Sequence, residues 1–579
     1  MEEGKEINKE QQLEVLRHST SHVLAQAVKR LFPEAKLGIG PPIKDGFYYD
    51  FDIDGEVLSK NLSKIKEEMK KIIKEDLPFE KEVVSKEEAK RIFKEREEPY
   101  KLKLLEEIED EKVSIYRQGE FVDLCRGPHL ESTGKIKHFA LLSVAGAYWH
   151  GKEGNPMLSR IYGTCFFTKQ ELENYLEWIE EAKRRDHRKL GRELGIFDIY
   201  PELGQGLAVY HPNGSLIREI IENFEKEEHL KRDYQLVRTP HISKAELWKI
   251  SGHLDFYREN MYVFSIDGEE YVLKPMNCPG HIMVYKSKQR SYKELPIKLF
   301  ELGTVYRREA SGVLHGLLRL RGFTQDDAHI FCMPSQLIDE VREVLRFCLF
   351  MMDTFNLGYK VTLSTRPAKS IGSDDLWERS TSALKQALEK EGIEFEIAPG
   401  EGAFYGPKID IQMRDALGRL WQGPTVQVDF NLPERFNLTY VASGGEKKRV
   451  VMIHRVVLGT IDRFLGVLIE HVEGKFPVWL APVQARILTI TDKETSYARE
   501  IYNNLKTQGI RVELDSRKEM LNYKIREAQL QKIPYMVILG KRERESRTLT
   551  VRKRDGENIK GIPVEEFVSM VKEKVTKRN

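Results

Sequence analysis

The sequence predicts a multidomain α+β protein. Its 579 residues exceed what a single hydrophobic core usually organises. From about residue 190 to 475, strand-like and helix-like segments mix without strict alternation, which favours an antiparallel sheet flanked by helices. Residues 476–579 alternate strand and helix, which favours a small α/β domain with a mostly parallel sheet.

The N-terminal third divides by composition. Residues 13–31 carry apolar side chains at helical spacing, residues 59–98 read as highly charged helix punctuated by DLPF, and residues 113–166 read as short strands. Residues 168–194 predict one long charged helix, a connector. We therefore expect four segments, which are 1–167, a helical linker at 168–190, 191–475 and 476–579.

The middle segment opens with an expected helix, NGSLIREIIENFEKEEHLKRDY, for which Asn213 or Ser215 is the expected cap. The strand YQLVRTPHI follows and ends around Pro240.

Composition excludes several classes of protein. The chain has no run of 18 apolar residues, so no membrane span is expected, and the start MEEGKEINKE is too charged for a secretory signal. Five cysteines without paired spacing indicate a reducing cytoplasm. Residues 476–579 hold 22 Lys and Arg against 14 Asp and Glu, which fits a polyanion partner such as RNA, although a solvated surface explains the excess equally well.

The stretch from Tyr306 to His329 carries the most chemistry. Its flanks read as strands, and the period of two along a strand places Phe323, Gln325, Asp327 and His329 on one face. Arg307 and Glu309 share a face in the same way. A buried polar row of this kind needs partners, which a nucleotide and a metal ion would supply.

The charged residues suit a nucleotide. The arginine fork of Arg307 suits an α-phosphate, and the Glu309 carboxylate suits an adenine amino group. Phe323 offers an apolar face for a base, and Arg463 could cover its other face or meet the γ-phosphate. Any one of these arginines taken alone is more often part of a surface ion pair.

These motifs resemble those of class II aminoacyl-tRNA synthetases. YRRE followed by RLRGF is similar to the second signature motif of that family, GTIDRF to the third, and the helix and strand ending at Pro240 to the first, which forms the dimer interface. No P-loop and no dinucleotide-binding glycine pattern competes. The resemblance implies a class II antiparallel-sheet catalytic core at 191–475 and a homodimer.

Cys278, His329 and His454 are candidate metal ligands. Their spacing alone is a weak indication, but KPMNCPGH, QDDAHIFC and VVMIHRVV each resemble zinc-binding strings of threonyl-tRNA synthetases. The resemblance implies one Zn²⁺ per subunit, with positions left open for the amino and hydroxyl groups of L-threonine. A site that ligates the hydroxyl can reject valine by roughly 10⁴ or more.

The same resemblance assigns further residues. Asp327 would accept the threonine hydroxyl proton, and Arg307 and Gln325 would hold the carboxylate. ATP would enter with Mg²⁺, and its reaction would be stabilised by arginines. The residues that match the family's catalytic positions are Arg307, Arg319, Arg463 and, for transfer to tRNA, His253. Those that match other pocket or nucleotide positions are Tyr405, Lys408, Gln422 and Gln427.

Serine requires a second site. It lacks only one methyl group of threonine, which is worth about 1–3 kcal/mol of discrimination. His18 and His22 share a helix face, and Cys125 and His129 are four residues apart, so HxxxH and CxxxH resemble the editing domain of threonyl and alanyl synthetases. Lys101 and Asp123 match further positions there. The residues alone leave a zinc site open, whereas the resemblance implies hydrolysis of seryl-tRNA without a metal.

The last segment resembles the anticodon-binding domain of the threonyl, prolyl, histidyl and glycyl enzymes, with Glu543 and Arg552 at anticodon-reading positions. The small ubiquitin-like domain that precedes the editing domain in many bacterial relatives is expected to be absent. The resemblance implies a cytoplasmic threonine–tRNA ligase that uses ATP, L-threonine and tRNA(Thr). An alanyl or prolyl enzyme and a synthetase-like RNA-binding regulator are the rival interpretations.

Overall fold

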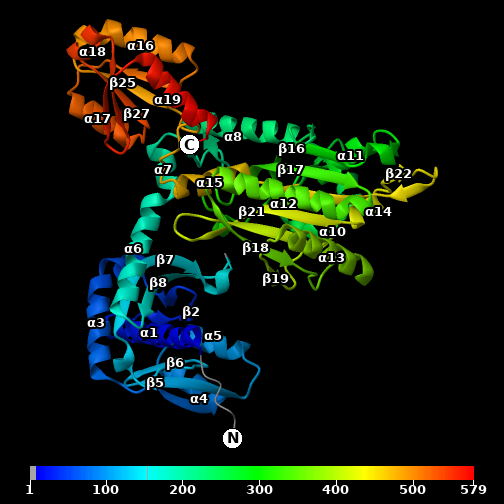
Figure 1. Ribbon diagram of the computed structural model, residues 1–579. Helices are drawn as coiled ribbons and strands as arrows, with labels where there is room; N and C mark the ends of the chain where they lie inside the picture. The colour runs from blue at the N-terminus through cyan, green and yellow to red at the C-terminus, as the bar shows by residue number, and fades with distance from the viewer. Residues whose placement is uncertain (1–7, 153, 579) are drawn as a thin grey trace. The chain divides into compact units, whose positions relative to one another are not determined.

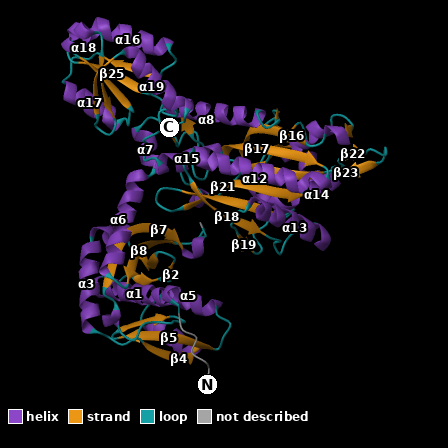
Figure 2. Ribbon diagram, viewed as in Figure 1, coloured by secondary structure: helices purple, strands orange, loops and turns teal. Residues whose placement is uncertain are grey.

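The computed structural model describes residues 8–152 and 154–578 (Figures 1 and 2). This part of the chain forms two compact units, and the boundary between them in the sequence falls between Glu180 and Glu181. Residues 1–7, with which the predicted segment 1–167 and the charged start MEEGKEINKE begin, lie outside the described residues, as does Asn579 at the end of 476–579.

The N-terminal unit is built around its first helix. The helices of this unit are α1 (Lys9–Leu31), α2 (Gly55–Lys60), α3 (Leu62–Glu75), α4 (Lys86–Glu95) and α5 (Pro99–Glu107). Its strands are β1 (Lys36–Leu37), β2 (Pro42–Ile43), β3 (Gly46–Asp52), β4 (Glu80–Ser85), β5 (Lys112–Gln118), β6 (Phe121–Leu124), β7 (His138–Tyr148) and β8 (Met157–Phe166). Asn8 and Gln11 form a capping box at the start of α1, and Val23, Leu24 and Val28 are fully buried against the sheet β1-β3-β8-β7.

Two predictions for this unit were wrong. The charged segment 59–98 is not continuous helix, because β4 lies between α3 and α4 and pairs antiparallel with β5 in the sheet β4-β5-β6. The strands within 113–166 are not all short, since β7 has 11 residues and β8 has 10. Their pairing with each other gives the unit its longest ladder, and a ladder of that length could not be inferred from local composition.

The connector is two helices rather than the single helix expected over 168–194. They are α6 (Lys169–Arg185) and α7 (His187–Glu193). The break falls at Asp186, whose carboxylate accepts a hydrogen bond from Arg188 N at 2.8 Å and so caps a new helix. None of the described residues of α6 is buried.

The second unit contains a large sheet with the strand order β11-β16-β17-β24-β21-β20-β18-β19 among its described residues. Besides α7, its helices before residue 476 are α8 (Pro212–Leu230), α9 (Ala245–Ser251), α10 (His253–Tyr257), α11 (Cys278–Lys286), α12 (Leu337–Thr354), α13 (Asp374–Glu391), α14 (Asn431–Arg435) and α15 (Ile461–His471). Its long strands are β16 (Ile297–Tyr306), β17 (Gly322–Cys332), β18 (Gly358–Ser364), β20 (Lys408–Arg414), β21 (Leu420–Asp429) and β24 (Val451–Val456).

The remaining strands of this region are shorter. They are β9 (Phe197–Asp198), β10 (Val209–Tyr210), β11 (Gln235–Leu236), β12 (Ile242–Lys244), β13 (Tyr262–Ile266), β14 (Glu269–Leu273), β15 (Arg290–Ser291), β19 (Glu396–Ala398), β22 (Thr439–Val441) and β23 (Lys447–Arg449). The inner pairings of the large sheet are antiparallel, as predicted, and the pairings of β11 and β19 at its edges are parallel. The expected strand YQLVRTPHI is shorter than predicted, because only Gln235–Leu236 and Ile242–Lys244 pair.

The prediction that Asn213 or Ser215 caps α8 was also wrong. His211 occupies the cap position without a side-chain hydrogen bond, and Pro212, which has no N–H to satisfy, is the first helical residue. The amide of Asn213 instead donates to Leu194 O at 2.9 Å.

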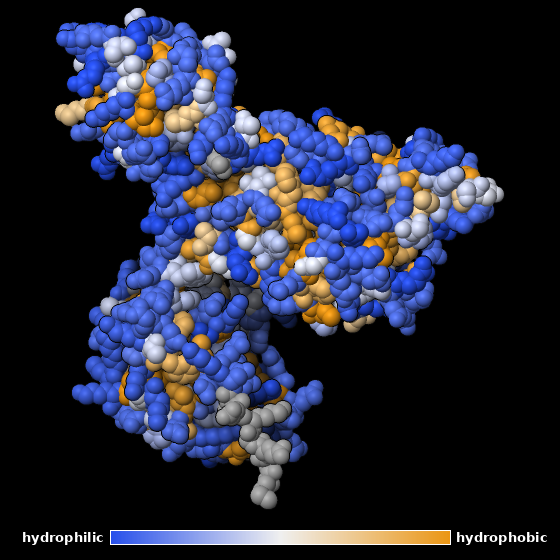
Figure 3. Space-filling view, viewed as in Figure 1, coloured by the Kyte–Doolittle hydropathy of each residue, from blue (hydrophilic) through white to orange (hydrophobic). Residues whose placement is uncertain are grey.

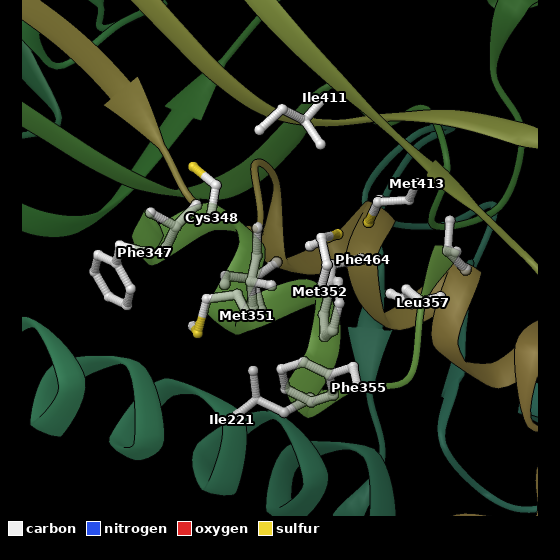
Figure 4. Close-up of a cluster of buried hydrophobic side chains, with 14 of the residues drawn as sticks. Ile221, Phe347, Cys348, Met351, Met352, Phe355, Leu357, Ile411, Met413 and Phe464 are labelled. Atoms are coloured by element: carbon white, nitrogen blue, oxygen red, sulfur yellow. The ribbon is translucent and has the colours of Figure 1, made fainter. Parts of the chain in front are cut away.

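The sheet has one apolar and one polar face at its centre. On β17, Ala328 and Ile330 belong to the core that α12 and α15 cover, whereas the alternate residues point away from that core. Figure 4 shows part of this core, where Met352, Phe355 and Phe464 pack together beneath the sheet. The alternation leaves Gln325, Asp327 and His329 on the opposite face.

Residues after 476 form a smaller sheet with the strand order β26-β25-β27-β28-β29. The elements are β25 (Ala485–Thr489), α16 (Thr495–Thr507), β26 (Val512–Asp515), α17 (Leu521–Leu530), β27 (Tyr535–Leu539), α18 (Lys541–Ser546), β28 (Leu549–Lys553), β29 (Asn558–Ile562) and α19 (Val564–Thr576). Strands β25, β26 and β27 are parallel as expected, but β28 and β29 add antiparallel pairings, so the sheet is mixed rather than mostly parallel.

No helix in the described part of the chain combines the length and the apolar character that crossing a membrane requires. The surface in Figure 3 is largely hydrophilic, with apolar residues in small groups.

Replacement of Met352 by alanine should destabilise the second unit. Met352 is fully buried in the core under the sheet, so truncation leaves a cavity and costs about 2–5 kcal/mol. The matched control is Met520→Ala, because Met520 is 82% exposed. Chemical denaturation followed by circular dichroism would measure both variants, and equal stabilities would contradict the assignment of this core.

Candidate functional site

Two cavities share a wall on the polar face of the large sheet. The first has a volume of about 490 Å³ and the second about 320 Å³. The residues that line both are Tyr257, Arg307, Gln325, Thr425 and Val456. The first cavity is lined by Cys278, Asp327, His329 and His454 and the second by Arg319 and Arg463, so the pair offers chemically distinct halves of one site.

Cys278, His329 and His454 converge in the first cavity from distant parts of the chain. His329 and His454 are direct partners in the register of β17 and β24, and Cys278 is the first residue of α11. One ligand atom from each lies within 4.8 Å of the other two, and His329 Nε2 is 3.0 Å from His454 Nδ1. The three residues predicted as metal ligands therefore meet at one point.

The outer ring nitrogens of both histidines have partners. His454 Nε2 lies 2.9 Å from Asp429 Oδ2, and His329 Nδ1 lies 2.8 Å from His281 Nδ1. Contacts of this kind fix ring orientation and aim the other nitrogen at a metal. Sequence reasoning missed Asp429 and His281, although His281 lies in the KPMNCPGH string and is three residues after Cys278.

The electrostatics of the trio fit a divalent cation. Burial lowers the pKa of His329 well below its ordinary value and so keeps the imidazole neutral, which is the form that binds metal. Burial, followed by the Asp327 and Asp429 carboxylates, raises the pKa of the Cys278 thiol. A cation here would offset the charge of both carboxylates and of a thiolate, and a set of one sulfur and two nitrogens suits zinc.

Asp327 and Gln325 stand beside the trio on β17. Asn277 donates from Nδ2 to Asp327 Oδ2 at 3.0 Å, and burial raises the pKa of the Asp327 carboxyl. Asp327 and Gln325 both line the first cavity, as their shared face predicts. Asn277 is a further residue that the sequence did not single out.

The second cavity carries an excess of positive charge. Burial and then the neighbouring Arg307 and Arg319 lower the pKa of Arg463, so these guanidinium groups repel one another. Arg463 Nε donates to Leu318 O at 2.9 Å, and Arg319 forms an ion pair with Glu309 at 2.9 Å. An anionic ligand would relieve the repulsion, as the arginine motifs predict.

The aromatic wall and the remaining predicted pocket residues lie around this site. The Arg307 guanidinium is 5.1 Å from the centre of the Phe323 ring. Tyr405 donates to Gln427, Lys408 pairs with Asp410 at 2.9 Å, and Gln422 donates to Asp410 at 2.7 Å. Tyr405, Lys408 and Gln427 line the first cavity, and Gln422 lines the second.

His253 is fully buried rather than at the cavity wall. Its Nδ1 is 2.7 Å from Ser251 Oγ, and its Nε2 has no hydrogen-bond partner among the described residues. Burial, then the proximity of His454 and Arg307, lowers its pKa to about 4. His253 therefore lies close enough to both cavities for the residues that line them to change its pKa.

Asp326, the neighbour of Asp327 on β17, points to the other face of the sheet. Its carboxylate accepts hydrogen bonds from the backbone N–H groups of Val457, Leu458 and Gly459, at 2.5, 2.9 and 2.7 Å. These groups form the turn between β24 and α15, which carries Arg463. These hydrogen bonds hold the GTIDRF motif, which begins at Gly459, against β17, the strand that begins within the RLRGF part of the second motif.

A second cluster lies in the N-terminal unit. His18, His22, Cys125 and His129 bring four ligand atoms within 4.8 Å of one another. Cys125 Sγ is 3.3 Å from His18 Nε2 and 3.2 Å from His129 Nε2. His18 and His22 come from α1, and Cys125 and His129 from the loop after β6, so the HxxxH and CxxxH motifs meet as predicted.

Lys101 and Asp123 form a buried ion pair beside this cluster, at 2.5 Å. Tyr49, which the sequence analysis missed, donates to Asp123 Oδ2 at 2.6 Å and accepts from Lys101 Nζ at 3.1 Å. Burial, followed by the Asp123 charge, raises the pKa of the Cys125 thiol to about 12. The cluster thus consists of a neutral thiol and imidazoles whose pKa values burial lowers.

The two predicted residues of the last domain lie near each other. Glu543 accepts from Gly540 N at 3.0 Å, as part of the cap of α18, and from Thr550 Oγ1 at 2.8 Å. Arg552 is two residues beyond Thr550 on β28 and therefore shares its face of the strand. The Glu543 carboxylate has a structural partner at each oxygen.

Three family profiles match successive parts of the chain. Residues 113–162 match the threonyl and alanyl tRNA synthetase second additional domain, and residues 262–472 match the class II core domain of the G, H, P, S and T synthetases. Residues 483–574 match the anticodon-binding domain.

Solved structures agree. The chain superposes on the RNA-binding domain of the threonyl-tRNA synthetase from Cryptosporidium parvum Iowa II with a TM-score of 0.65 and 40% identity, over 67% of this chain and 98% of that one. For a putative threonyl-tRNA synthetase from Aeropyrum pernix, the TM-score is 0.60 and the identity 34%, over 68% and 96%.

Curated relatives extend the similarity along the chain. Threonine–tRNA ligase from Citrifermentans bemidjiense is 56% identical, over 97% of this chain and 88% of the relative. The same enzyme from Dehalococcoides mccartyi is 55% identical, over 97% of both chains. With this identity along nearly its whole length and the profiles in the same order, the chain belongs to the threonine–tRNA ligases, the threonyl branch of the class II aminoacyl-tRNA synthetases.

Proposed function

We propose that this chain activates L-threonine with ATP in the paired cavities of the second unit and transfers it to tRNA(Thr). One observation carries the proposal. The Cys278, His329 and His454 trio lines a cavity that borders the arginine-lined cavity, so an amino acid and a nucleotide bound in the two cavities would share a wall at Arg307 and Gln325.

The trio would select the amino acid. A zinc ion held by Cys278, His329 and His454 would supply Lewis-acid positions for the amino and hydroxyl groups of threonine. Asp327 would accept the hydroxyl proton and Arg307 and Gln325 would hold the carboxylate, and all three line the first cavity. Valine offers no hydroxyl to these polar groups, so their desolvation would go uncompensated and valine would be rejected by roughly 10⁴ or more.

The arginine half would bind ATP as its magnesium complex. Arg307 would orient the α-phosphate for in-line attack by the threonine carboxylate, which would break the bond to the β-phosphate and release pyrophosphate. Arg463 and Arg319 would neutralise charge on the departing phosphates. Phe323 and Glu309 would hold the adenine by its face and its amino group. His253 is assigned to the transfer of threonine to the tRNA ribose, since its buried Nε2 lacks a partner among the described residues.

The N-terminal cluster would remove serine. We propose that His18, His22, Cys125 and His129 position a water molecule for hydrolysis of seryl-tRNA(Thr), while Lys101 and Asp123 hold the substrate. We assign no metal to this cluster, because the carboxylate beside it is already neutralised by Lys101. The catalytic trio differs, since its carboxylates Asp327 and Asp429 pair with the histidines of the trio itself, His329 and His454.

The last domain would read the anticodon through Glu543 on α18 and Arg552 on β28, the next element of the chain. The predicted segment boundaries at residues 167, 190 and 475 remain part of this proposal.

Replacement of one ligand of the trio should remove the bound zinc. Cys278→Ala should lower bound zinc from one to less than about a tenth of an equivalent and reduce threonine-dependent pyrophosphate exchange at least about 100-fold, because one of three protein ligands is gone. The matched control is Cys332→Ala, a buried cysteine of β17 outside the trio. Mass spectrometry of bound metal would contradict the assignment if Cys278→Ala kept its zinc, and two equivalents in the wild type would contradict a metal-free N-terminal cluster.

Activation and editing should fail separately. Arg307→Ala should reduce pyrophosphate exchange at least about 100-fold, since the α-phosphate loses its charged partner, while hydrolysis of seryl-tRNA(Thr) persists. His129→Ala should do the reverse, with threonine activation within about twofold of wild type. Each variant is the control for the other. Loss of both activities in either variant would count against two separate sites.

We infer a homodimer formed through the region of α8 and β11. Its support is a set of exposed apolar side chains on these and neighbouring elements: Leu216, Leu230, Leu236, Ile242 and Ile250, each between 37% and 53% exposed. Sedimentation equilibrium should give twice the chain mass of 67.4 kDa, and Leu236→Glu should shift the distribution toward monomer. A wild-type protein that stays monomeric at micromolar concentration would exclude this assembly.

A further inference from the structure

We propose that His187 is a positioning residue for the ATP pocket, although it lies at the end of the connector and outside all three sequence motifs. Its buried imidazole ties helix α15 to the loop between β16 and β17, and so holds the second cavity in shape. The inference rests on the proposed function, because it assigns ATP to that cavity.

His187 uses both ring nitrogens. Its Nδ1 lies 2.6 Å from Glu470 Oε1, and its backbone N–H donates to the same oxygen at 3.1 Å. On the other side of the ring, Nε2 accepts a hydrogen bond from Leu317 N at 3.0 Å. A neutral imidazole with its proton on Nδ1 satisfies all these contacts at once, and the side chain is completely buried.

The loop side of this contact is the wall of the nucleotide cavity. Leu317 and the adjacent Leu318 line the cavity, and Leu318 O accepts from Arg463 Nε at 2.9 Å. Gly316 has φ +48°, and a Cβ at this position would overlap the His187 ring. The loop therefore reaches the imidazole only because residue 316 is glycine.

The contacts form a closed circuit on one face of α15. Glu470 and Arg463 are seven residues apart, which is two helical turns, so they share a face. The circuit runs from Glu470 through His187 to Leu317, and from Leu318 back to Arg463. Leu318 fixes the Arg463 guanidinium directly, so a displaced loop would also displace a phosphate-binding arginine.

The rest of the junction anchors His187. Arg185, two residues earlier, donates to His471 O at 2.9 Å at the C-terminus of α15, where a cation is favoured. The second oxygen of Glu470 pairs with Arg419. These contacts hold His187 against α15. The remaining contact of the imidazole, with Leu317 N, therefore holds the loop.

Two amide variants separate the two halves of the circuit. The amide of His187→Gln reaches the position of Nε2 and can still accept from Leu317 N, whereas that of His187→Asn matches Nδ1 and reaches only Glu470. The dissociation constant of a non-hydrolysable ATP analogue, measured by calorimetry without amino acid, should stay within about threefold of wild type for Gln and rise about tenfold for Asn, the usual effect of losing one buried hydrogen bond. The KM for threonine should change less than about twofold in both.

A glycine pair tests the loop from its own side. Gly316→Ala should weaken binding of the analogue about tenfold or more, because its Cβ meets the His187 ring. Gly312→Ala is the matched control in the same loop, since a Cβ there meets nothing within 4 Å, and it should bind as wild type does. Thermal unfolding of each variant would identify loss of the fold.

The outcomes distinguish this inference from the function on which it rests. Unaltered analogue binding in folded His187→Asn and Gly316→Ala proteins would overturn the role of His187 while leaving the ATP site in place. Equal weakening in His187→Gln and His187→Asn would overturn the contact with Leu317 as its cause. A wild-type protein that does not bind the analogue would overturn the proposed function, and this inference with it.

Discussion

The catalytic cavity depends on one buried carboxylate. Asp326 accepts hydrogen bonds from three successive backbone N–H groups and so fixes the turn at which β24 becomes α15. Burial raises its pKa to about 7, against the opposing effects of Arg455 and these N–H groups. Because β17 alternates its side chains, the strand that anchors the turn through Asp326 presents Asp327 to the cavity. The two halves of the site are thereby tied to a single strand.

The site separates charge within a short distance. Carboxylates gather at the Cys278, His329 and His454 end, where Asp327, Asp429 and Glu301 are buried. Arg307, Arg319 and Arg463 gather at the other end, and their mutual repulsion lowers the pKa of Arg463. A cation at the first end and a polyanion at the second would offset these charges. The proposal of a metal-bound amino acid beside a nucleotide rests on this polarity.

The sequence predicted those parts of the fold and site that local pattern determines. The strands around Tyr306–His329 and the shared face of Gln325, Asp327 and His329 followed from the period of two. The meeting of Cys278 with His329 and His454 came from family strings, since residues so far apart in sequence cannot be paired by spacing.

The strands and residues that the sequence did not predict are those that depend on tertiary contacts. Strand β4 has little apolar character, and its pairing with β5 is a tertiary contact. Strand β28 directly follows the charged helix α18, so the local composition does not indicate where the strand begins. His281, Asp429, Tyr49 and His187 were missed for the same reason, because each acquires its role from a partner brought to it by the fold.

The helix α6 joins two hydrophobic cores without belonging to either. None of its described residues is buried, and each unit closes a core of its own on its side. Its side chains make surface contacts instead, among them the Tyr175 ring against Phe166 and the hydrogen bond from Arg185 to His471 O. Because each unit has a core of its own, a substitution inside one core leaves the packing of the other unchanged, so natural selection can tune the accuracy of proofreading and the rate of synthesis as separate traits.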